Sequence, residues 1–276
     1  MQPQQHMYLL VDAGNTHVHL NLGNAGRMHL PVPLKINLDE LSSETANQSV
    51  VKIVDKFKEH SKKGNTEFAV VASVIPSMNK LIENWIIKNF GIPSHFISYL
   101  SPGMVDLNYP KPETIGIDRL ANAVACAKKG NLPSVVVDFG TATTFDVINK
   151  NGAYCGGIIA PGISLMTDYL HEKTELLPKI TLNNPKSNIG KSTTEAMQIG
   201  AIDGYKGLIK QILEGIGAEL QSDVLDVIFT GGCTEIIRIR NEDLNSEISF
   251  TIRSHVNQNI TMEGLGILAP QIRDIS

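Results

Sequence analysis

The stretch VVDFGTATTFDVI, residues 136–148, contains the pattern that decides the fold. Its first part is a short apolar run, rich in β-branched residues, that ends at Gly140 as a buried strand would. The part after Gly140 is β-branched again, which favours a second strand over a helix. The stretch therefore predicts a hairpin made of a strand, a tight turn and another strand.

A similar hairpin is predicted in the first half of the chain. The segment VDAGNT, residues 11–16, closes an apolar strand. After it, Val18, Leu20 and Leu22 alternate with polar residues at a period of two. One such hairpin in each half predicts two similar domains that face each other across a cleft, with both turns pointing into it.

Helical patterns separate the predicted strands. Apolar residues recur at helical spacing from Met78 to Phe90, and Gly91 follows as a stop signal. A longer periodic run extends from Ile199 to Ile216. Strands that alternate with helices in this way indicate a mixed α/β fold.

The composition limits the partners that the protein can take. The chain has 276 residues, 42% of them hydrophobic, which is enough for one large or two small domains with a core. A net charge of −4 and 5% aromatic residues are not typical of a nucleic-acid-binding protein. No apolar run approaches the roughly 18 residues of a membrane helix, and the first residues lack a secretion signal. We therefore expect a cytoplasmic protein that acts on a small molecule, with no nucleic-acid or membrane partner.

The two predicted turns are suited to binding phosphate. A glycine there lets the backbone approach a ligand, and Thr16, Thr141, Thr143 and Thr144 add hydroxyl donors. The chain has neither a Walker motif nor a strand–GxGxxG–helix motif, so charge compensation must come from a cation. Asp12 and Asp138 offer hard oxygen ligands for it. A single Asp-x-Gly can simply close a hairpin, but two matching copies favour a shared phosphate role.

A third motif, Gly116-Ile117-Asp118-Arg119, opens a predicted helix. Asp118 there is either an N-cap or a carboxylate that accepts a hydroxyl proton from a substrate. Arg119 could hold a carboxylate or a phosphoryl group.

Further along the chain, Ser192 and Glu195 form the pattern of a capping box, which leaves Thr193 to face a ligand. His17 and His19 share a strand face with no carboxylate or cysteine at ligand spacing, which argues against a zinc site. Cys126 lies on the apolar side of its helix, where packing is the expected role.

Taken in chain order, these motifs resemble those of the type III pantothenate kinases, in the superfamily of acetate and sugar kinases, heat-shock chaperones and actin. The resemblance spans nearly the whole chain. It is carried by VDAGNT (11–16), VASVIP (71–76), Tyr109, GIDRLANAVA (116–125), VVDFGTATTFDVI (136–148), GGIIAPGI (156–163), GKSTTEAMQIG (190–200), TGG (230–232) and TMEGLGILA (261–269).

The resemblance implies a fold, an activity and an assembly. It implies two ribonuclease-H-like (actin-like ATPase) domains, at residues 1–125 and 126–261, each with a mixed sheet flanked by helices and with the active-site cleft between them. A helix at about 262–276 would pack back on the first domain. The implied activity is transfer of the ATP γ-phosphoryl group to the primary hydroxyl of pantothenate, which gives 4′-phosphopantothenate for coenzyme A. ATP would act with Mg²⁺ and a monovalent cation (K⁺ or NH₄⁺), in a homodimer whose pocket lies at the subunit interface.

The resemblance also implies a role for particular residues. Asp118 would be the general base, and Asp138 would bind the monovalent cation. The pantothenate pocket would be lined by Tyr109, Gly116, Ile117, Asp118, Arg119 and Thr193. The ATP site would be formed by Asp12, Ala13, Gly14, Asn15, Thr16, His17, Val18, His19 and Thr141.

Two other functions remain open at this point. One is a regulatory relative that does not catalyse, although no catalytic motif is degraded and the acidic balance disfavours contact with DNA. The other is a kinase or phosphatase of the same superfamily that acts on a different acid. The loop around Tyr109 reads LNYPKP, whereas many members of the resembled family have RYDNP.

Overall fold

The structure is a computed structural model that describes residues 6–24, 27–42, 48–61, 66–129, 131–246 and 248–273. The chain forms two compact units. Unit 1 comprises Met1–Lys129 and Gln258–Ser276, and unit 2 comprises Gly130–Asn257. None of the helices in the described ranges is long and apolar enough to span a membrane.

Unit 1 is built on a mixed sheet with the strand order β3-β2-β1-β5-β6, and β4 also pairs with β2. β1 runs antiparallel to β2 and parallel to β5, and β5 runs parallel to β6. The strands are β1 (Met7–Ala13), β2 (His17–Asn24), β3 (Arg27–Met28), β4 (Leu34–Asn37), β5 (Thr66–Ser73) and β6 (Ser94–Phe96).

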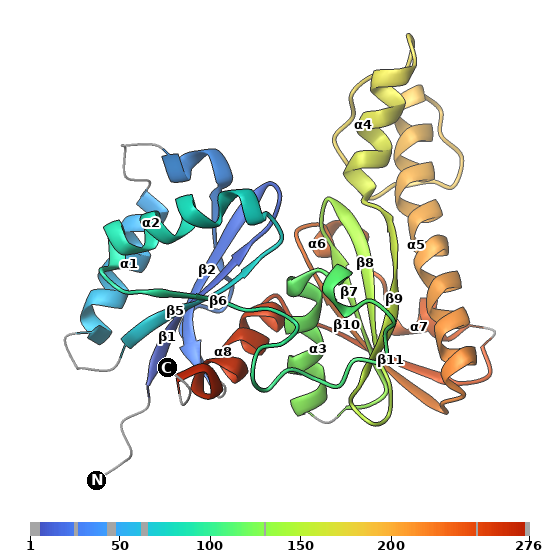
Figure 1. Cartoon of the computed structure of the whole chain (residues 1–276). Coiled ribbons are helices and arrows are strands. Elements are labelled where there is room, and N and C mark those ends of the chain that lie inside the picture. Colours follow the sequence, from blue (N-terminus) through green and yellow to red (C-terminus); the bar gives the residue numbers. More distant parts are fainter. Residues whose placement is uncertain are drawn as a thin grey trace. The chain divides into compact units, whose positions relative to one another are not determined.

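Helices cover both faces of this sheet. One face carries a core in which Leu9 and Val11 of β1 cluster with residues of α1 and α2, such as Phe57 and Trp85. The other face contacts α8, which packs against α3 and against β1, β2 and β5 (Figure 1). The helices are η1 (Leu38–Ser42), α1 (Gln48–Ser61), η2 (Pro76–Met78), α2 (Asn79–Phe90), η3 (Pro112–Thr114), α3 (Ile117–Lys129) and α8 (Ile260–Arg273).

Unit 2 is built on a second mixed sheet, with the order β11-β10-β7-β8-β9. β7 runs antiparallel to β8 and parallel to β10, and β10 runs parallel to β11. The strands are β7 (Ser134–Phe139), β8 (Ala142–Ile148), β9 (Tyr154–Pro161), β10 (Val224–Thr230) and β11 (Thr251–Val256).

The core of unit 2 lies between one face of this sheet and α5. Val137 and Phe145 of the sheet cluster there with Tyr205 and Ile209 of α5. α5 packs against α4 and extends beyond the sheet beside it (Figure 1). The helices are α4 (Ile163–Lys173), α5 (Thr193–Leu220), α6 (Thr234–Ile237) and α7 (Asn241–Asn245).

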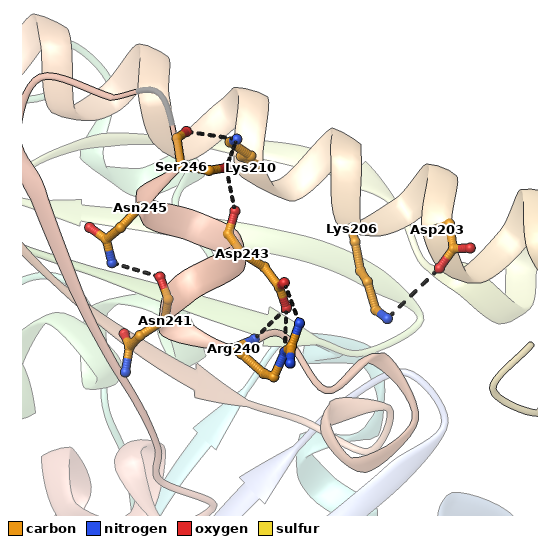
Figure 2. A network of polar contacts seen from close by, with 8 residues as sticks. All are labelled: Asp203, Lys206, Lys210, Arg240, Asn241, Asp243, Asn245 and Ser246. Carbon is orange, nitrogen blue, oxygen red and sulfur yellow. Dashed lines mark hydrogen bonds and ion pairs between the residues drawn. The ribbon is translucent and has the colours of Figure 1, made fainter. Parts of the chain in front are cut away.

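A polar network joins α7 to the middle of α5 (Figure 2). Lys210 of α5 donates to the carbonyl of Ser246 at 2.9 Å and to its hydroxyl at 2.6 Å. At the start of α7 the guanidinium of Arg240 binds both carboxylate oxygens of Asp243, at 3.0 and 2.8 Å. These polar contacts add to the apolar packing of Leu244, the buried residue of α7 that belongs to the same core cluster as α5.

The two sheets share one topology. Each sheet contains an antiparallel hairpin, β1–β2 or β7–β8, and the next strand along the chain, β3 or β9, pairs with the second strand of that hairpin. Two later strands, β5 and β6 or β10 and β11, then extend the sheet on the other side, parallel to the first strand of the hairpin. The prediction of two similar mixed-sheet domains is confirmed, and so are both hairpins, β1–β2 and β7–β8. The predicted helix stop at Gly91 is confirmed too, since this residue caps α2 in the left-handed conformation (φ 69°).

Candidate active site

The first turn, in unit 1, joins β1 to β2. The Gly14 N–H donates to the carbonyl of His17 at 2.9 Å, and the Leu38 N–H donates to that of Thr16 at 3.2 Å. Asn15 and Thr16 are exposed at the tip. Ala13 and Val18 are buried in the core, so at these two predicted ATP-binding positions only the backbone is available to a ligand.

Asp12 and His19 face each other beside this turn. They are paired across the hairpin, and His19 Nδ1 lies 3.5 Å from Asp12 Oδ2. Sequence spacing showed no carboxylate or cysteine beside the two histidines, but in the structure one carboxylate, that of Asp12, lies beside His19. The register of the hairpin, which residue spacing alone does not give, brings Asp12 to His19. No group of three or more His, Cys, Asp or Glu that could hold a metal ion occurs within the described residues.

His17 lies on the same strand face as His19, with ring centroids 6.3 Å apart. Burial lowers the pKa of His17, and the nearby Lys35 and His19 lower it further, against a hydrogen bond with Asn37 that raises it. The neutral imidazole is therefore favoured at this position near pH 7.

Strand alternation places Asp12 on the sheet face that carries α3 and α8. Leu9 and Val11 point into the core with α1 and α2, so Asp12 points the other way, as does its partner His19. Asn21, two residues beyond His19, reaches Asn259 at the start of α8 with its Nδ2 2.8 Å from the Asn259 Oδ1. Asp12 and the GIDR motif at the start of α3 thus belong to one side of unit 1.

The GIDR motif forms the first turn of α3. The helix begins at Ile117, and the Gly116 carbonyl accepts from the N–H groups of Arg119 and Leu120. Asp118 is therefore the second residue of the helix and not its N-cap, which corrects one of the two readings of this residue. Its Oδ1 accepts from the Arg119 N–H at 2.9 Å, and a carboxylate is stabilised in this first turn by the helix dipole.

Gly116 lies directly against the Asp118 carboxylate. A Cβ added to Gly116 would stand 2.5 Å from Asp118 Oδ1, so the small residue leaves room for this carboxylate position. Ile117 is buried, whereas Asp118 and Arg119 are partly exposed. Tyr109 precedes the motif in a segment without regular structure, and its side chain is exposed.

The second turn, in unit 2, lies where the parallel strands β7 and β10 both end. Asp138 of β7 is paired with Thr230 of β10, and Gly231 follows that strand with a φ of +91°. A Cβ on Gly231 would lie 2.4 Å from Asp138 Oδ1 and 2.6 Å from the Phe139 nitrogen. Gly231, which belongs to the TGG motif quoted from the sequence, therefore shapes the surroundings of Asp138.

Gly162, at the end of β9, closes the same turn from another side. Its N–H donates to the Thr141 carbonyl at 3.0 Å. A Cβ on Gly162 would lie 2.3 Å from that oxygen and 2.6 Å from the Gly140 carbonyl oxygen. Its φ of −66° suits any residue, so close packing is what calls for glycine here.

The threonines that follow the turn divide between two faces of β8. Thr144 is paired with Asp138 and is partly exposed, whereas Thr143 is buried and opposite Phe139, whose side chain lies in the core. The Thr143 hydroxyl bonds to the Tyr205 hydroxyl of α5. Thr143 is thus no donor to an external phosphate, which corrects the sequence interpretation. Thr141 is exposed, as a phosphate-binding residue must be.

Thr193 is the exposed first residue of α5. Ser192 caps this helix, since its side chain accepts from the Glu195 N–H at 3.2 Å. The Glu195 carboxylate does not return to the N-cap, as a capping box would require, but accepts from the Lys191 N–H at 2.7 Å. The capping role of Ser192 is confirmed. Glu195 binds the backbone of Lys191, the residue before the N-cap, instead of the N-cap itself.

Sequence reasoning missed three features of the second turn. These are Tyr205 behind it and the close approaches of Gly162 and Gly231. Both glycines stand in motifs quoted from the sequence, GGIIAPGI and TGG, but their contacts depend on which strands become neighbours. Tyr205 had no separate signal, because it occupies a regular apolar position of a periodic helix.

Comparison with known proteins identifies the family. The family profile described as type III pantothenate kinase matches residues 8–215. The type III pantothenate kinase of Akkermansia muciniphila is 40% identical over 262 residues, which cover 95% of this chain and 98% of that protein. That of Finegoldia magna is 34% identical, over 94% of this chain and 95% of that protein.

Solved structures agree on the fold. A propionate kinase from Francisella tularensis gives a TM-score of 0.50 at 10% identity, over 95% of this chain and 99% of that one. A Baf family transcriptional activator from Campylobacter jejuni gives 0.50 at 22% identity, over 97% and 98%. At such identities the likeness shows the two-domain kinase fold alone. The sequence relatives decide the rest: the chain belongs to the type III pantothenate kinases, ATP-dependent enzymes of coenzyme A biosynthesis that phosphorylate pantothenate.

Proposed function

We propose that this chain transfers the γ-phosphoryl group of ATP to the primary hydroxyl of pantothenate, giving 4′-phosphopantothenate and ADP. The observation that carries the proposal is the repeated hairpin. Each copy places a carboxylate, Asp12 or Asp138, at the end of a strand beside a tight glycine turn. Phosphoryl transfer asks a protein mainly for positioning and charge neutralisation, and such turns can supply both.

The first turn is proposed to hold ATP phosphates with its backbone and tip. The segment from Asp12 to His19 is proposed to supply backbone N–H groups and the hydroxyl of the exposed Thr16, while the side chains of Ala13 and Val18 are buried in the core. In the second turn the exposed Thr141 is the proposed contact to ATP. Backbone donors fit an acidic protein that binds an anionic nucleotide, since they neutralise phosphate without a lysine.

Asp138 is proposed to bind a monovalent cation, K⁺ or NH₄⁺, and Mg²⁺ is proposed to arrive with ATP. Its carboxylate is a hard oxygen donor that lies in a cradle that a Cβ on Gly231 would fill. The residues therefore fit such an ion. When bound, it would supply positive charge beside the phosphates.

Asp118 is proposed as the general base. It takes the proton of the pantothenate hydroxyl as the hydroxyl oxygen bonds to the γ-phosphorus, and the bond from that phosphorus to the β–γ bridging oxygen breaks to release ADP. The first-turn position, with the carboxylate lying against Gly116, supports this role because it fixes the oxygen at an exposed helix end.

The pantothenate pocket is proposed to include Arg119, Tyr109 and Thr193 through their side chains and Gly116 and Ile117 through the backbone. The Arg119 guanidinium is suited to the pantothenate carboxylate, which it can bind through two parallel hydrogen bonds. Ile117 is buried, so its side chain supports the pocket from behind.

The protein is proposed to act as a homodimer with this pocket at the subunit interface. Leu165, Met166, Tyr169 and Leu170 follow one another at helical spacing along α4 and are all exposed. A row of large apolar side chains on one side of a helix is typical of a surface covered by a partner. Leu165→Glu should give a monomer by light scattering, whereas Ile87→Glu, at a similar exposure on α2 (49% against 50%), should leave the dimer intact.

A cytoplasmic location is proposed as well. Its support is the two proposed substrates, ATP and pantothenate, which are used inside the cell. Fractionation of cells that express the protein from its own promoter tests it, and recovery in the membrane or secreted fraction would contradict it.

The central experiment is an assay of ADP release with purified protein, ATP, Mg²⁺, K⁺ and pantothenate. We expect turnover that requires pantothenate, and its absence in folded protein would refute the proposal. Other small hydroxy acids, tested alongside, would reveal a different acceptor. Asp118→Asn should lower kcat by about 10²–10⁴-fold while ATP still binds. Replacing K⁺ by tetramethylammonium should lower turnover of the wild type much more than that of Asp138→Asn.

A further inference from the structure

We infer that Tyr205 is a positioning residue for ATP, because its hydroxyl holds the second turn from behind. The inference rests on the proposed ATP role of Thr141. Tyr205 touches no exposed part of the turn: it lies on α5 in the core of unit 2 and is 1% exposed. Its effect on the nucleotide must therefore pass through the residues that it binds.

Two hydrogen bonds join the Tyr205 hydroxyl to β8, which begins at the turn, and to β9, which ends beside it. The hydroxyl donates its single hydrogen to the Pro161 carbonyl at 2.9 Å. It must therefore accept from the hydroxyl of Thr143, the other group that it bonds. Burial raises the pKa of the Tyr205 phenol, so the hydrogen is retained at neutral pH. One side chain thus holds both β8 and β9.

The connection continues through a single peptide group. The carbonyl of Pro161 accepts from Tyr205, and the N–H of the same peptide group, on Gly162, donates to the Thr141 carbonyl at 3.0 Å. Because a peptide group is planar and stiff, fixing its carbonyl also fixes the direction of its N–H. Tyr205 therefore sets where the Thr141 backbone stands, although the two residues do not touch.

Gly162 makes this arrangement sensitive to small shifts. Its Cα packs so closely on the turn that an added Cβ would lie 2.3 Å from the Thr141 oxygen. A rotation of the Pro161–Gly162 peptide group would move the turn or lose the hydrogen bond to it. Groups that bind a transferring phosphoryl must be held to within fractions of an ångström, so loss of the Tyr205 hydroxyl should be felt at the nucleotide.

The experiment compares Tyr205→Phe with a matched control, Tyr154→Phe, in the β8–β9 hairpin to which Tyr205 is bonded. Tyr154 is equally buried, and it pairs with Ile148 at the opposite end of the β8–β9 ladder, with its hydroxyl on Asp146. Tyr154→Phe removes a similar buried hydroxyl away from the turn. We expect Tyr205→Phe to raise the KM for ATP and the Kd for MgATP about three- to tenfold, the worth of about one hydrogen bond. The KM for pantothenate should stay within about twofold, and Tyr154→Phe should change none of these values.

Variants of Thr143 test the same connection from its other side. Thr143→Val should raise the Kd for MgATP as much as Tyr205→Phe does, whereas Thr143→Ser, which keeps the hydroxyl, should bind MgATP nearly as well as the wild type. The double variant with Thr143→Val and Tyr205→Phe should be no worse than either single variant. Thermal melts establish that each protein is folded at the assay temperature.

The outcomes separate this inference from the proposed function. A wild type without pantothenate-dependent turnover refutes the function, while MgATP binding measured by calorimetry still decides the role of Tyr205. Equal Kd values for wild type and Tyr205→Phe would overturn the inference. So would an equal loss in Tyr154→Phe, because the effect would then be one of general stability.

Discussion

In unit 1 the turn after β1 is closed within its own hairpin and by one hydrogen bond from Leu38, whereas in unit 2 the turn after β7 is packed against residues that follow two neighbouring strands. A Cβ on Gly14 would lie 3.4 Å from the His17 carbonyl oxygen, an ordinary contact. The turn at Gly140, by contrast, is packed against Gly162, which directly follows β9, and lies beside Asp138, which is close to Gly231 after β10. Two sheets of one topology therefore support their turns differently, and the second turn depends on residues remote in sequence.

The largest effect is expected at Gly231, where a substitution causes both backbone strain and a steric clash. Gly231→Ala introduces a non-glycine residue at a φ of +91° and pushes a Cβ into Asp138 and Phe139. We expect the free energy of unfolding to fall by about 3 kcal/mol, from backbone strain and overpacking together. Urea unfolding measures this change, and turnover should fall with it because Asp138 is displaced.

Gly232→Ala is the matched control for this stability measurement. A Cβ there meets nothing within 4 Å and the backbone needs no left-handed conformation, so the unfolding free energy should change by less than about 0.5 kcal/mol. If both variants unfold at the same urea concentration, Gly231 has no special packing role.

The second expected effect separates the two turns directly. Gly162→Ala should lower the free energy of unfolding by about 1–3 kcal/mol through overpacking and raise the KM for ATP, because the Thr141 carbonyl must move. Gly14→Ala should change stability by less than about 1 kcal/mol, since its Cβ has room. Equal destabilisation by the two substitutions would abolish the contrast between the turns.

A third test asks whether a carboxylate in unit 1 depends on a glycine as Asp138 does in unit 2. Gly116→Ala places a Cβ 2.5 Å from Asp118 Oδ1, an atom at the far end of its side chain, so the carboxylate would have to turn away from its present position. We expect the fold to tolerate the change and kcat to fall about 10- to 100-fold, because the proposed general base, Asp118, is displaced. Steady-state kinetics and a thermal melt decide, and an unchanged kcat would show that this carboxylate position does not matter for the reaction.

The smallest effect is expected in the network of Figure 2, which belongs to neither turn. Arg240 holds the pKa of Asp243 below its ordinary value of 3.8, mainly through its hydrogen bonds. A lowered carboxyl pKa adds stability above pH 3.8, and this stability is lost as the pH falls through the folded-state value. Asp243→Asn should thus lower the Tm by about 1–2 °C at pH 7. The difference should shrink below pH 3.8, and turnover should not change.

The parts that sequence predicted well are those with local causes. The hairpins follow from β-branched runs on either side of a glycine, and the stop of α2 follows from Gly91. The parts that it missed depend on register and on strand neighbours. The threonines after Gly140 could be told apart only by counting their pairing with Asp138 and Phe139, and the approach of His19 to Asp12 required the same step.

The packing of α8 has a consequence for the order in which the chain can fold. α8 ends the second structural repeat, yet it packs against α3 in unit 1, where a Cβ on Gly264 would lie 1.9 Å from the Ala121 carbonyl oxygen. During synthesis, the apolar side of α3 has no such cover until α8 has left the ribosome. Unit 2 is continuous and can close on its own while unit 1 waits. The half made first is therefore the half completed last.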